Sequence, residues 1–400
     1  MIKNAILSGS LNMKPFVFLI FVILQSILVL AQQGAISVFV SGNEGHQIYR
    51  IPAIVKASNG DLLAFAEGRV NGADDFGDIN IVLKRSQDQG KTWSSLSKVV
   101  DYENLQAGNP APVVDLLDPN YPKRRIFLFY NTGNNHENEI RKGNGVREVW
   151  YKTSVDDGRT WSEPVNITLQ VHKPNQPKVN PVYSFSEDWR HYANTPGHAL
   201  QFSCEPYQGR IYIPANHSEG TEKKPNEDYF AHGFYTDDHG KSFHLSENVN
   251  LAGSNECSAA ELSNGGLMLN IRNQNGHIRA RIVAISKNGG ESWDNIFFDK
   301  QLPDPVCEGS ILNIGKMKGK MILAFCNAAD TTERNNLTLR ISKDEGVSWP
   351  LTFAIDKNPP NKSFDYSAYS DLVKTGKHKI GILYEKDDYS RIVFRTIEWK

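Results

Sequence analysis

The octapeptide "SQDQGKTW", residues 86–93, decides which fold the sequence predicts, because it recurs along the chain. Further copies lie at residues 154–161, 236–243, 286–293 and 342–349, and all five fit the pattern S/T-x-D/N-x-G-x-x-W/F. An Asp or Asn side chain accepts hydrogen bonds from nearby backbone N–H groups, and Gly supplies a positive φ, so each copy is typical of a tight turn. A turn repeated in this way indicates a repeated structural unit.

The segments before these turns predict β-strands. "INIVLKRS" and "LTLRISK", which precede the first and last copies, alternate in polarity and are rich in β-branched residues. The copies begin between 50 and 82 residues apart, so the chain has room for about six such units. We therefore predict an all-β fold, a six-bladed β-propeller. Its first strand, residues 35–40, is expected to pair with the last, residues 391–399.

The first residues of the chain predict export. Lys3 and Lys14 precede the apolar run "FVFLIFVILQSILVLA", and the small residues Val29 and Ala31 precede a signal-peptidase site. We expect residues 1–31 to be a signal peptide, residues 32–400 to be one domain, and the protein to be secreted or periplasmic. The run is short for a membrane span, so an uncleaved anchor is the alternative, and no membrane insertion is expected after cleavage.

Composition excludes some classes of partner. The 44 Lys and Arg residues nearly equal the 45 Asp and Glu residues, so no basic surface for nucleic acid is expected. The four cysteines are Cys204, Cys257, Cys307 and Cys326, and none belongs to a CxxC pair. We therefore predict free, buried thiols, no metal site and no cofactor.

One charged residue stands out inside an apolar strand. The segment "HQIYRIPAIV", residues 46–55, contains Arg50 among residues that predict burial. Burying an unpaired guanidinium costs several kcal/mol. Arg50 is therefore expected to meet an anionic group.

Five turn repeats together with "YRIP" resemble the sialidase (neuraminidase) family, whose repeat is known as the Asp box. The resemblance implies three arginines that bind the carboxylate of sialic acid: Arg50, Arg272 in "GLMLNIR", and Arg334 in "TERNNLTLRISKDEG". Arg340 is the alternative to Arg334 in that segment. Three guanidiniums can satisfy both carboxylate oxygens through charge-assisted hydrogen bonds. The resemblance also implies that Glu385, in "GILYEKDD", orients the first arginine.

The resemblance implies a tyrosine nucleophile, Tyr369 in "SAYSDLV", activated by Glu256 in "SNECSAAEL". A carboxylate nucleophile would be repelled by the substrate's own carboxylate, by about 4 kcal/mol at roughly 4 Å for an effective dielectric near 20. A neutral phenol avoids this repulsion but, with a pKa of about 10, needs a base beside it. Tyr366 and Glu261 are the alternatives for the two roles.

The general acid and base is expected on the glycine-flanked loop in "AEGRVNGADDFGDINIVLKRS". The family's spacing selects Asp75, and Asp74 and Asp78 are the alternatives. Arg69 and Asn109 resemble further positions that contact the substrate.

Together these residues imply an exo-α-sialidase that hydrolyses terminal α-linked sialic acid from sialylated glycans, with retention, through a tyrosyl-enzyme intermediate. The alternatives are a trans-sialidase or anhydro-product-forming sialidase on the same fold, and a non-catalytic sialic-acid-binding propeller. Pockets for the rest of the sugar are expected in residues 171–200, around Tyr183, Trp189 and Tyr192.

Overall fold

The computed structural model describes residue 1, residues 34–359 and residues 366–400. The predicted signal peptide, residues 1–31, lies outside the described residues except for Met1. Almost all regular structure is β-strand. The helical elements in the described ranges are short: α1 (Glu137–Arg141), α2 (Thr168–Val171) and the 3-10 turn η1 (Ser263–Gly265). None of the helices that the structure describes is long and apolar enough to cross a bilayer.

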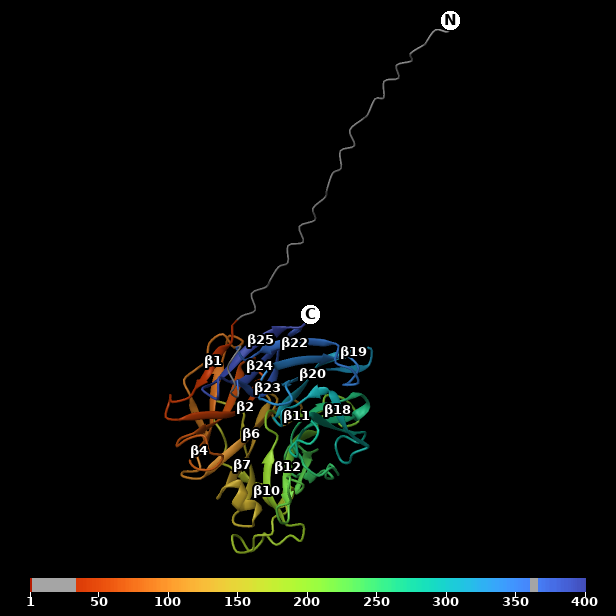
Figure 1. The fold of residues 1–400 in the computed structure, drawn as a ribbon. Helices are drawn as coiled ribbons and strands as arrows, with labels where there is room; N and C mark the ends of the chain where they lie inside the picture. The colour runs from red at the N-terminus through yellow and green to blue at the C-terminus, as the bar shows by residue number, and fades with distance from the viewer. Residues whose placement is uncertain (2–33, 360–365) are drawn as a thin grey trace. The chain divides into compact units, whose positions relative to one another are not determined.

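Six groups of strands follow one another along the chain, from the red end of Figure 1 to the blue end. The first blade contains β2 (Ile48–Lys56), β3 (Leu62–Arg69), β4 (Ile79–Ser86) and β5 (Ser97–Val100). The second blade contains β6 (Gln106–Asp115), β7 (Arg125–Gly133), β8 (Arg147–Ser154) and β9 (Val165–Asn166). The third blade contains β10 (Trp189–Asn194), β11 (Leu200–Gln201), β12 (Ile211–Glu219), β13 (Tyr229–Thr236) and β14 (His244–Leu245).

The last three blades complete the set. The fourth blade contains β15 (Ser254–Glu261), β16 (Leu267–Asn273), β17 (Ala280–Ser286) and β18 (Asn295–Pro303). The fifth blade contains β19 (Gly309–Met317), β20 (Lys320–Ala328), β21 (Leu337–Ser342) and β22 (Leu351–Asp356). The sixth blade contains β23 (Ser367–Gly376), β24 (Lys379–Lys386) and β25 (Arg391–Glu398), together with β1 (Ile36–Val40).

Hydrogen bonding joins these six blades into five sheets. Three sheets have four strands, one has five, and one has eight. The eight-stranded sheet contains the first two blades, which are linked by a single parallel pairing between Ile79 and Gln106. Six blades are therefore counted only when this sheet is divided at that pairing.

The innermost strands form a closed ring. β2 contacts both β6 and β23, β6 contacts β10 and β12, β12 contacts β15, and β19 joins β15 to β23. The ring is closed as predicted, because β1 pairs with β25, with Ile36 opposite Phe394 and Val40 opposite Arg391; the two strands lie side by side in Figure 1. The predicted all-β propeller class is confirmed.

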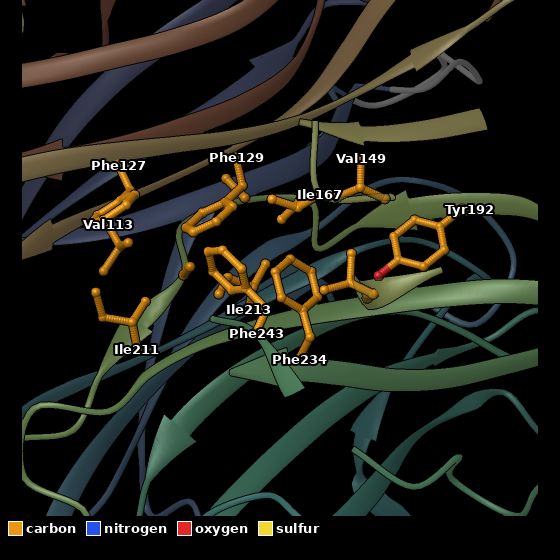
Figure 2. Packing of buried hydrophobic residues seen from close by; sticks show 14 of the residues in the cluster. Val113, Phe127, Phe129, Val149, Ile167, Tyr192, Ile211, Ile213, Phe234 and Phe243 are labelled. Carbon is orange, nitrogen blue, oxygen red and sulfur yellow. The ribbon is translucent and has the colours of Figure 1, made fainter. Parts of the chain in front are cut away.

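The repeated octapeptides form the predicted turns. Asp88 Oδ1 accepts hydrogen bonds from the backbone N–H groups of Lys91, at 3.0 Å, and Thr92, at 2.9 Å. The Ser86 hydroxyl accepts from the N–H of Gly90, whose φ is +89°. The terminal aromatic residues pack between blades: Figure 2 shows Phe243, the last residue of the third copy, against Phe129, with ring centroids 5.8 Å apart. The repeats are therefore scaffold.

The four cysteines are free. Cys257, Cys307 and Cys326 are buried and Cys204 is half-buried, so the prediction of free thiols is confirmed and burial is complete for three of them.

Candidate active site

A cavity of about 480 Å³ lies at one mouth of the ring of inner strands. Eight of the nine predicted site residues line it: Arg50, Arg69, Asp75, Asn109, Glu256, Arg272, Arg334 and Tyr369. The ninth, Glu385, is buried directly behind this wall and bonds to Arg50. The folded chain thus gathers residues more than 300 positions apart into one polar cavity.

The inner strands present these side chains at irregularities in their pairing. The register of four inner strands shifts between Arg50 and Ala53 in β2, Gly108 and Ala111 in β6, Ser254 and Cys257 in β15, and Ser367 and Ser370 in β23. Arg50, Asn109, Glu256 and Tyr369 lie at these shifts. A β-bulge bends its strand and re-aims a side chain, so it turns residues of a regular blade toward the cavity.

Glu385 supports both the first arginine and the tyrosine. Its Oε1 accepts hydrogen bonds from Arg50 Nε, at 2.7 Å, and from the N–H of Ile51, at 2.9 Å. Its Oε2 accepts from the N–H of Tyr369, at 3.2 Å. Ile51 has a φ of +56°, which is costly for a β-branched residue, and the bond to Glu385 holds it there. The position of Glu385 thus fits the predicted role of orienting Arg50, and its carboxylate also holds the backbone of Tyr369.

Tyr369, Glu256 and Arg272 form a connected group. The tyrosine hydroxyl donates to Glu256, with Oη 2.7 Å from Oε1, and Arg272 Nη1 lies 2.6 Å from Glu256 Oε2 and 2.8 Å from Tyr369 Oη. Burial and the adjacent Glu256 raise the pKa of Tyr369 well above its ordinary value, although Arg272 and Arg334 act to lower it. The phenol is therefore neutral and in contact with a base.

Three guanidiniums surround the tyrosine. The Cζ atoms of Arg50 and Arg334 lie 5.3 Å and 5.5 Å from the centroid of the Tyr369 ring, and Arg272 contacts its hydroxyl. We call Arg50, Arg272 and Arg334 the clamp. Three positive charges that converge on one cavity can bind a carboxylate through planar, charge-assisted hydrogen bonds.

The alternative residues lie elsewhere. Arg340 is in β21, where it bonds to an asparagine of β20 and does not line the cavity. Glu261 accepts from the backbone of residues 203 and 204 and lines a different cavity. The Tyr366 hydroxyl accepts a hydrogen bond from Lys386. The geometry therefore favours Arg334, Glu256 and Tyr369 over these three alternatives.

The acidic loop places two aspartates at the cavity. Asp75 is 72% exposed and its Oδ1 lies 2.7 Å from Arg69 Nη1, and Asp74 lines the same cavity. Asp78 instead accepts a hydrogen bond from Asn80. Although the Asp75 side chain is largely exposed, its desolvation within the cavity acts to raise its pKa, and Arg69 and Arg50 outweigh this effect and hold the pKa below its ordinary value. Asp75 is thus the loop carboxylate that shares the field of the arginines, and Asp74 remains its neighbour in the cavity.

Glu67, which was not among the predicted site residues, supports a second pair of them. Its Oε2 accepts from Arg69 Nε and Nη2, at 3.1 Å and 2.7 Å, and its Oε1 accepts from the N–H of Asn109, at 2.9 Å. Glu67 is 1% exposed. Its signal in the sequence was the same as that of Arg50, a charge within the apolar strand "LLAFAEGR".

A second side of the cavity was also missed. We call it the far wall; its residues are Gln106, Glu137, Arg147, His191 and Asn216. The remaining pockets were expected around Tyr183, Trp189 and Tyr192, but these three side chains are buried and do not line the cavity. Trp189, for example, stacks on His217, with ring centroids 3.5 Å apart. Because side chains alternate along a strand, β10 turns Tyr192 into the core and its neighbour His191 toward the cavity.

One group of side chains in the described ranges has the composition of a metal site: Asp115, Asp118 and His239. Arg125 Nη2 lies 2.8 Å from Asp118 Oδ2 and 3.8 Å from Asp115 Oδ2, and His239 Nδ1 lies 2.9 Å from Asp115. The guanidinium supplies the positive charge that a cation would bring. We therefore do not assign a metal to this group.

Comparisons with known proteins agree with this geometry. A family model described as "BNR repeat-like domain" matches residues 60–382. A sialidase of Micromonospora viridifaciens is 30% identical over 380 residues, covering 90% of this chain and 53% of that protein. An exo-alpha-sialidase of Arthroderma benhamiae is 30% identical over 367 residues, covering 86% and 79% of the two chains. The solved structure of "Hadza microbial sialidase Hz136" matches with a TM-score of 0.75 at 25% identity, over 91% of this chain and 68% of that one. The chain spans about half the length of the Micromonospora relative.

Proposed function

This chain belongs to the sialidase family, and on that premise we propose that it is an exo-α-sialidase that removes terminal sialic acid from sialylated glycans with retention. The Tyr369–Glu256 pair carries the proposal, since its hydroxyl and carboxylate oxygens lie 2.7 Å apart beside the clamp. A module that only binds the sugar needs the clamp and has no use for a tyrosine paired with a base.

In the binding step, the clamp holds the substrate's carboxylate. Glu385 engages Nε of Arg50, which leaves the two terminal nitrogens of that guanidinium for the substrate. Arg272 reaches the tyrosine hydroxyl through Nη1, so a carboxylate bound by the clamp brings the anomeric carbon next to Tyr369. Holding the reacting atoms together in this way lowers the entropic part of the barrier.

In the first chemical step, Glu256 accepts the phenol proton while Tyr369 Oη forms a bond to the anomeric carbon. The bond from that carbon to the leaving oxygen breaks, and Asp75 donates a proton to the leaving oxygen. A water molecule then attacks the anomeric carbon and gives a proton to Asp75, while Tyr369 leaves and recovers its proton from Glu256. Two inversions at one carbon give net retention.

The charge of the substrate explains how Asp75 could act as an acid. In the structure Arg69 and Arg50 hold its pKa below the ordinary value, against the effect of its desolvation in the cavity. A bound carboxylate places a negative charge among the same arginines, and this raises the pKa of Asp75 again. Gly72 and Gly77, with φ of +150° and +139°, flank the loop and permit it to move toward the leaving group.

We also propose that the enzyme acts outside the cytoplasm, on the basis of the sequence of residues 1–31 alone.

Turnover of a fluorogenic α-sialoside tests the proposal. Tyr369→Phe removes only the nucleophilic oxygen, so kcat should fall by about 10³-fold or more while the Tm stays within a few degrees. Tyr366→Phe, outside the cavity, is the matched control and should keep near-normal activity. Proton NMR of the early product should show the α-anomer of free sialic acid. An anhydro or transferred sugar would favour the alternative outcomes, and a Tyr369→Phe enzyme of near-normal activity would remove Tyr369 from the mechanism.

A further inference from the structure

A second cavity, of about 610 Å³, lies at the other end of the inner strands. On β2, Arg50 and Ile51 line the active-site cavity, and residues 54–56 line the second one. On β23, Tyr369 lines the first cavity and residues 372–374 line the second. The ring of blades therefore has a cavity at each of its two mouths, and a cavity of this size can hold a small molecule.

The walls of the second cavity are aliphatic. No Phe, Tyr or Trp of the described ranges lines it, and each of the six blades contributes an apolar side chain: Val55, Val113, Leu200, Ala259, Leu312 and Leu372. Leu200 and Leu312 are only half-buried, so part of this apolar surface is open to a ligand. Such walls leave the hydroxyl groups of a sugar without partners, whereas they gain free energy when an alkyl chain covers them.

Two carboxylates lie at this cavity, and both are already engaged by donors. Glu261 is 2% exposed and accepts from the backbone N–H groups of residues 203–204, at 3.0 Å and 2.9 Å. Asp371, behind the wall, accepts from the N–H of Ile54 at 2.7 Å, and its Oδ1 lies 2.6 Å from Nδ1 of His198. Neither carboxylate forms an ion pair with a described lysine.

Three exposed lysines line the same cavity near the outer ends of their strands: Lys56, Lys316 and Lys374. Within the part of the chain that the structure describes, none of them pairs with a carboxylate, and Lys316 Nζ instead lies 2.9 Å from Cys204 Sγ. Because the nearby carboxylates are engaged elsewhere, the three ammonium groups give this mouth a positive potential. The mouth therefore favours an anionic group above an apolar interior.

We propose that the second cavity binds an aliphatic carboxylate of the fatty-acid class, with its alkyl chain against the walls and its carboxylate at Lys56, Lys316 and Lys374. The aliphatic lining selects a chain, and the unpaired lysines select its charge. This site is separate from the clamp and from the far wall, and it does not rest on the proposed function.

Isothermal titration calorimetry with decanoate tests the proposal, and 1-decanol, which has the same chain without the charge, isolates the contribution of the lysines. We expect one decanoate per chain with a Kd on the order of 10 μM. The double variant Lys56→Glu/Lys374→Glu should weaken decanoate binding about 10-fold or more and leave decanol binding unchanged, because it reverses the charge of the mouth. Lys377→Glu, in the exposed turn after β23 and outside the cavity, is the matched control and should change neither affinity.

Two further variants locate the ligand. Leu312→Gln places a polar group in the wall and should weaken decanoate and decanol alike, by about 10-fold, while the half-buried position keeps the Tm within a few degrees of the wild type. Arg334→Met removes a guanidinium of the clamp and should leave decanoate affinity unchanged. A loss of affinity in Arg334→Met would place the carboxylate in the active-site cavity and overturn the inference.

Other results would also overturn it. They are no decanoate binding, equal affinities of the wild type for decanoate and decanol, and decanoate affinity that the lysine variants do not change. Sedimentation velocity covers the other occupant of an apolar mouth. A dimer that Leu312→Gln dissociates, without decanoate binding to the wild type, would assign the walls to a second copy of the chain instead.

Discussion

The outer turns and the central cavity both depend on carboxylates that accept backbone hydrogen bonds, but over very different distances along the chain. Asp88 accepts from residues three and four positions away. Glu385 accepts from Ile51, 334 positions away, and from Tyr369 on another strand. A contact completed within one octapeptide can repeat and remain stable wherever the octapeptide occurs. A contact between distant strands, such as that of Glu385 with Ile51, forms at only one place in the fold, and the geometry of the site depends on it.

The largest effect is expected where the long-range carboxylate loses its charge. Glu385→Gln leaves the largely enclosed Arg50 without its ion pair and weakens the bond that holds Ile51 at φ +56°. The free energy of unfolding should fall by about 3–5 kcal/mol, and kcat/KM should fall with it because Arg50 and Tyr369 lose their common support. Denaturant unfolding and kinetics below the new Tm measure the two effects.

Glu398, an exposed glutamate of β25 in the same blade, supplies the control for that variant. Glu398→Gln should change stability by no more than about 0.5 kcal/mol. If Glu385→Gln behaves in the same way, the cavity does not depend on its long-range carboxylate and the contrast with the turns disappears.

Acid should affect the interior before it affects the turns. Burial lowers the pKa of His191 to about 4, whereas the pKa of an unfolded histidine is about 6.5. As the pH falls below about 6.5, the unfolded chain therefore binds a proton that the folded chain does not. His191 thus contributes stability that is present above about pH 6.5 and lost as the pH falls toward 4, up to about 3 kcal/mol. Hydrogen bonds from Thr92 lower the pKa of Asp88 to about 2, so that turn loses its contribution only below its ordinary value of 3.8.

Thermal melts between about pH 7.5 and pH 3 check this order. His191→Gln should flatten the fall of Tm with acid, whereas His244→Gln, exposed in the same blade, should not. A Tm that is level down to pH 4 would contradict the buried, neutral state of His191.

A smaller loss of stability is expected for Glu67→Gln, although Glu67, like Glu385, binds one arginine and one backbone N–H of the site. Arg69 also donates to the carbonyl of Ala73, at 2.5 Å, and pairs with Asp75, so Glu67→Gln leaves it partly satisfied. We expect a loss of about 2 kcal/mol in unfolding free energy and a rise in KM larger than the fall in kcat. Glu103→Gln, on an exposed loop of the first blade, is the control. A loss as large as that of Glu385→Gln would show that the residual bonds of Arg69 contribute little.

The same contrast explains what the sequence could predict. The turns were predictable because the hydrogen bonds that shape them lie within eight residues, and the strand pairing of β1 with β25 followed from closing the ring. Arg50 was predictable because one charge stood in an apolar strand. The roles of Arg272, Arg334, Tyr369 and Glu256 came only from the family resemblance.

The rest depends on geometry that no local pattern contains. Glu67 had the same signal as Arg50, but its partner Asn109 lies 42 positions on and meets it only at a bulge. On β10 the sequence favoured the aromatic Tyr192, and strand alternation places His191 at the cavity instead. A shift of one residue exchanges core and cavity. Pro52 and Pro110 mark the bulges of β2 and β6, but the bulges of β15 and β23 contain no proline that would mark them.

The smallest effect belongs to the turns, and it is the sharpest test of their independence from the site. Asp156 Oδ1 accepts from the N–H groups of Arg159 and Thr160, at 3.0 Å and 2.9 Å. Asn288 occupies the same place in the fourth copy and accepts from the N–H of Ser292, at 3.0 Å.

Asp156→Asn should therefore cost less than about 0.5 kcal/mol, while Asp156→Ala, which loses every acceptor, should cost about 1–2 kcal/mol in urea unfolding. Neither should change kcat/KM at 25 °C, because the hydrogen bonds of the Asp156 side chain close within the octapeptide and none reaches an inner strand. A fall in kcat/KM for a fully folded Asp156→Ala enzyme would show that turn and cavity are coupled, and the distinction between local scaffold and long-range site would have to be abandoned.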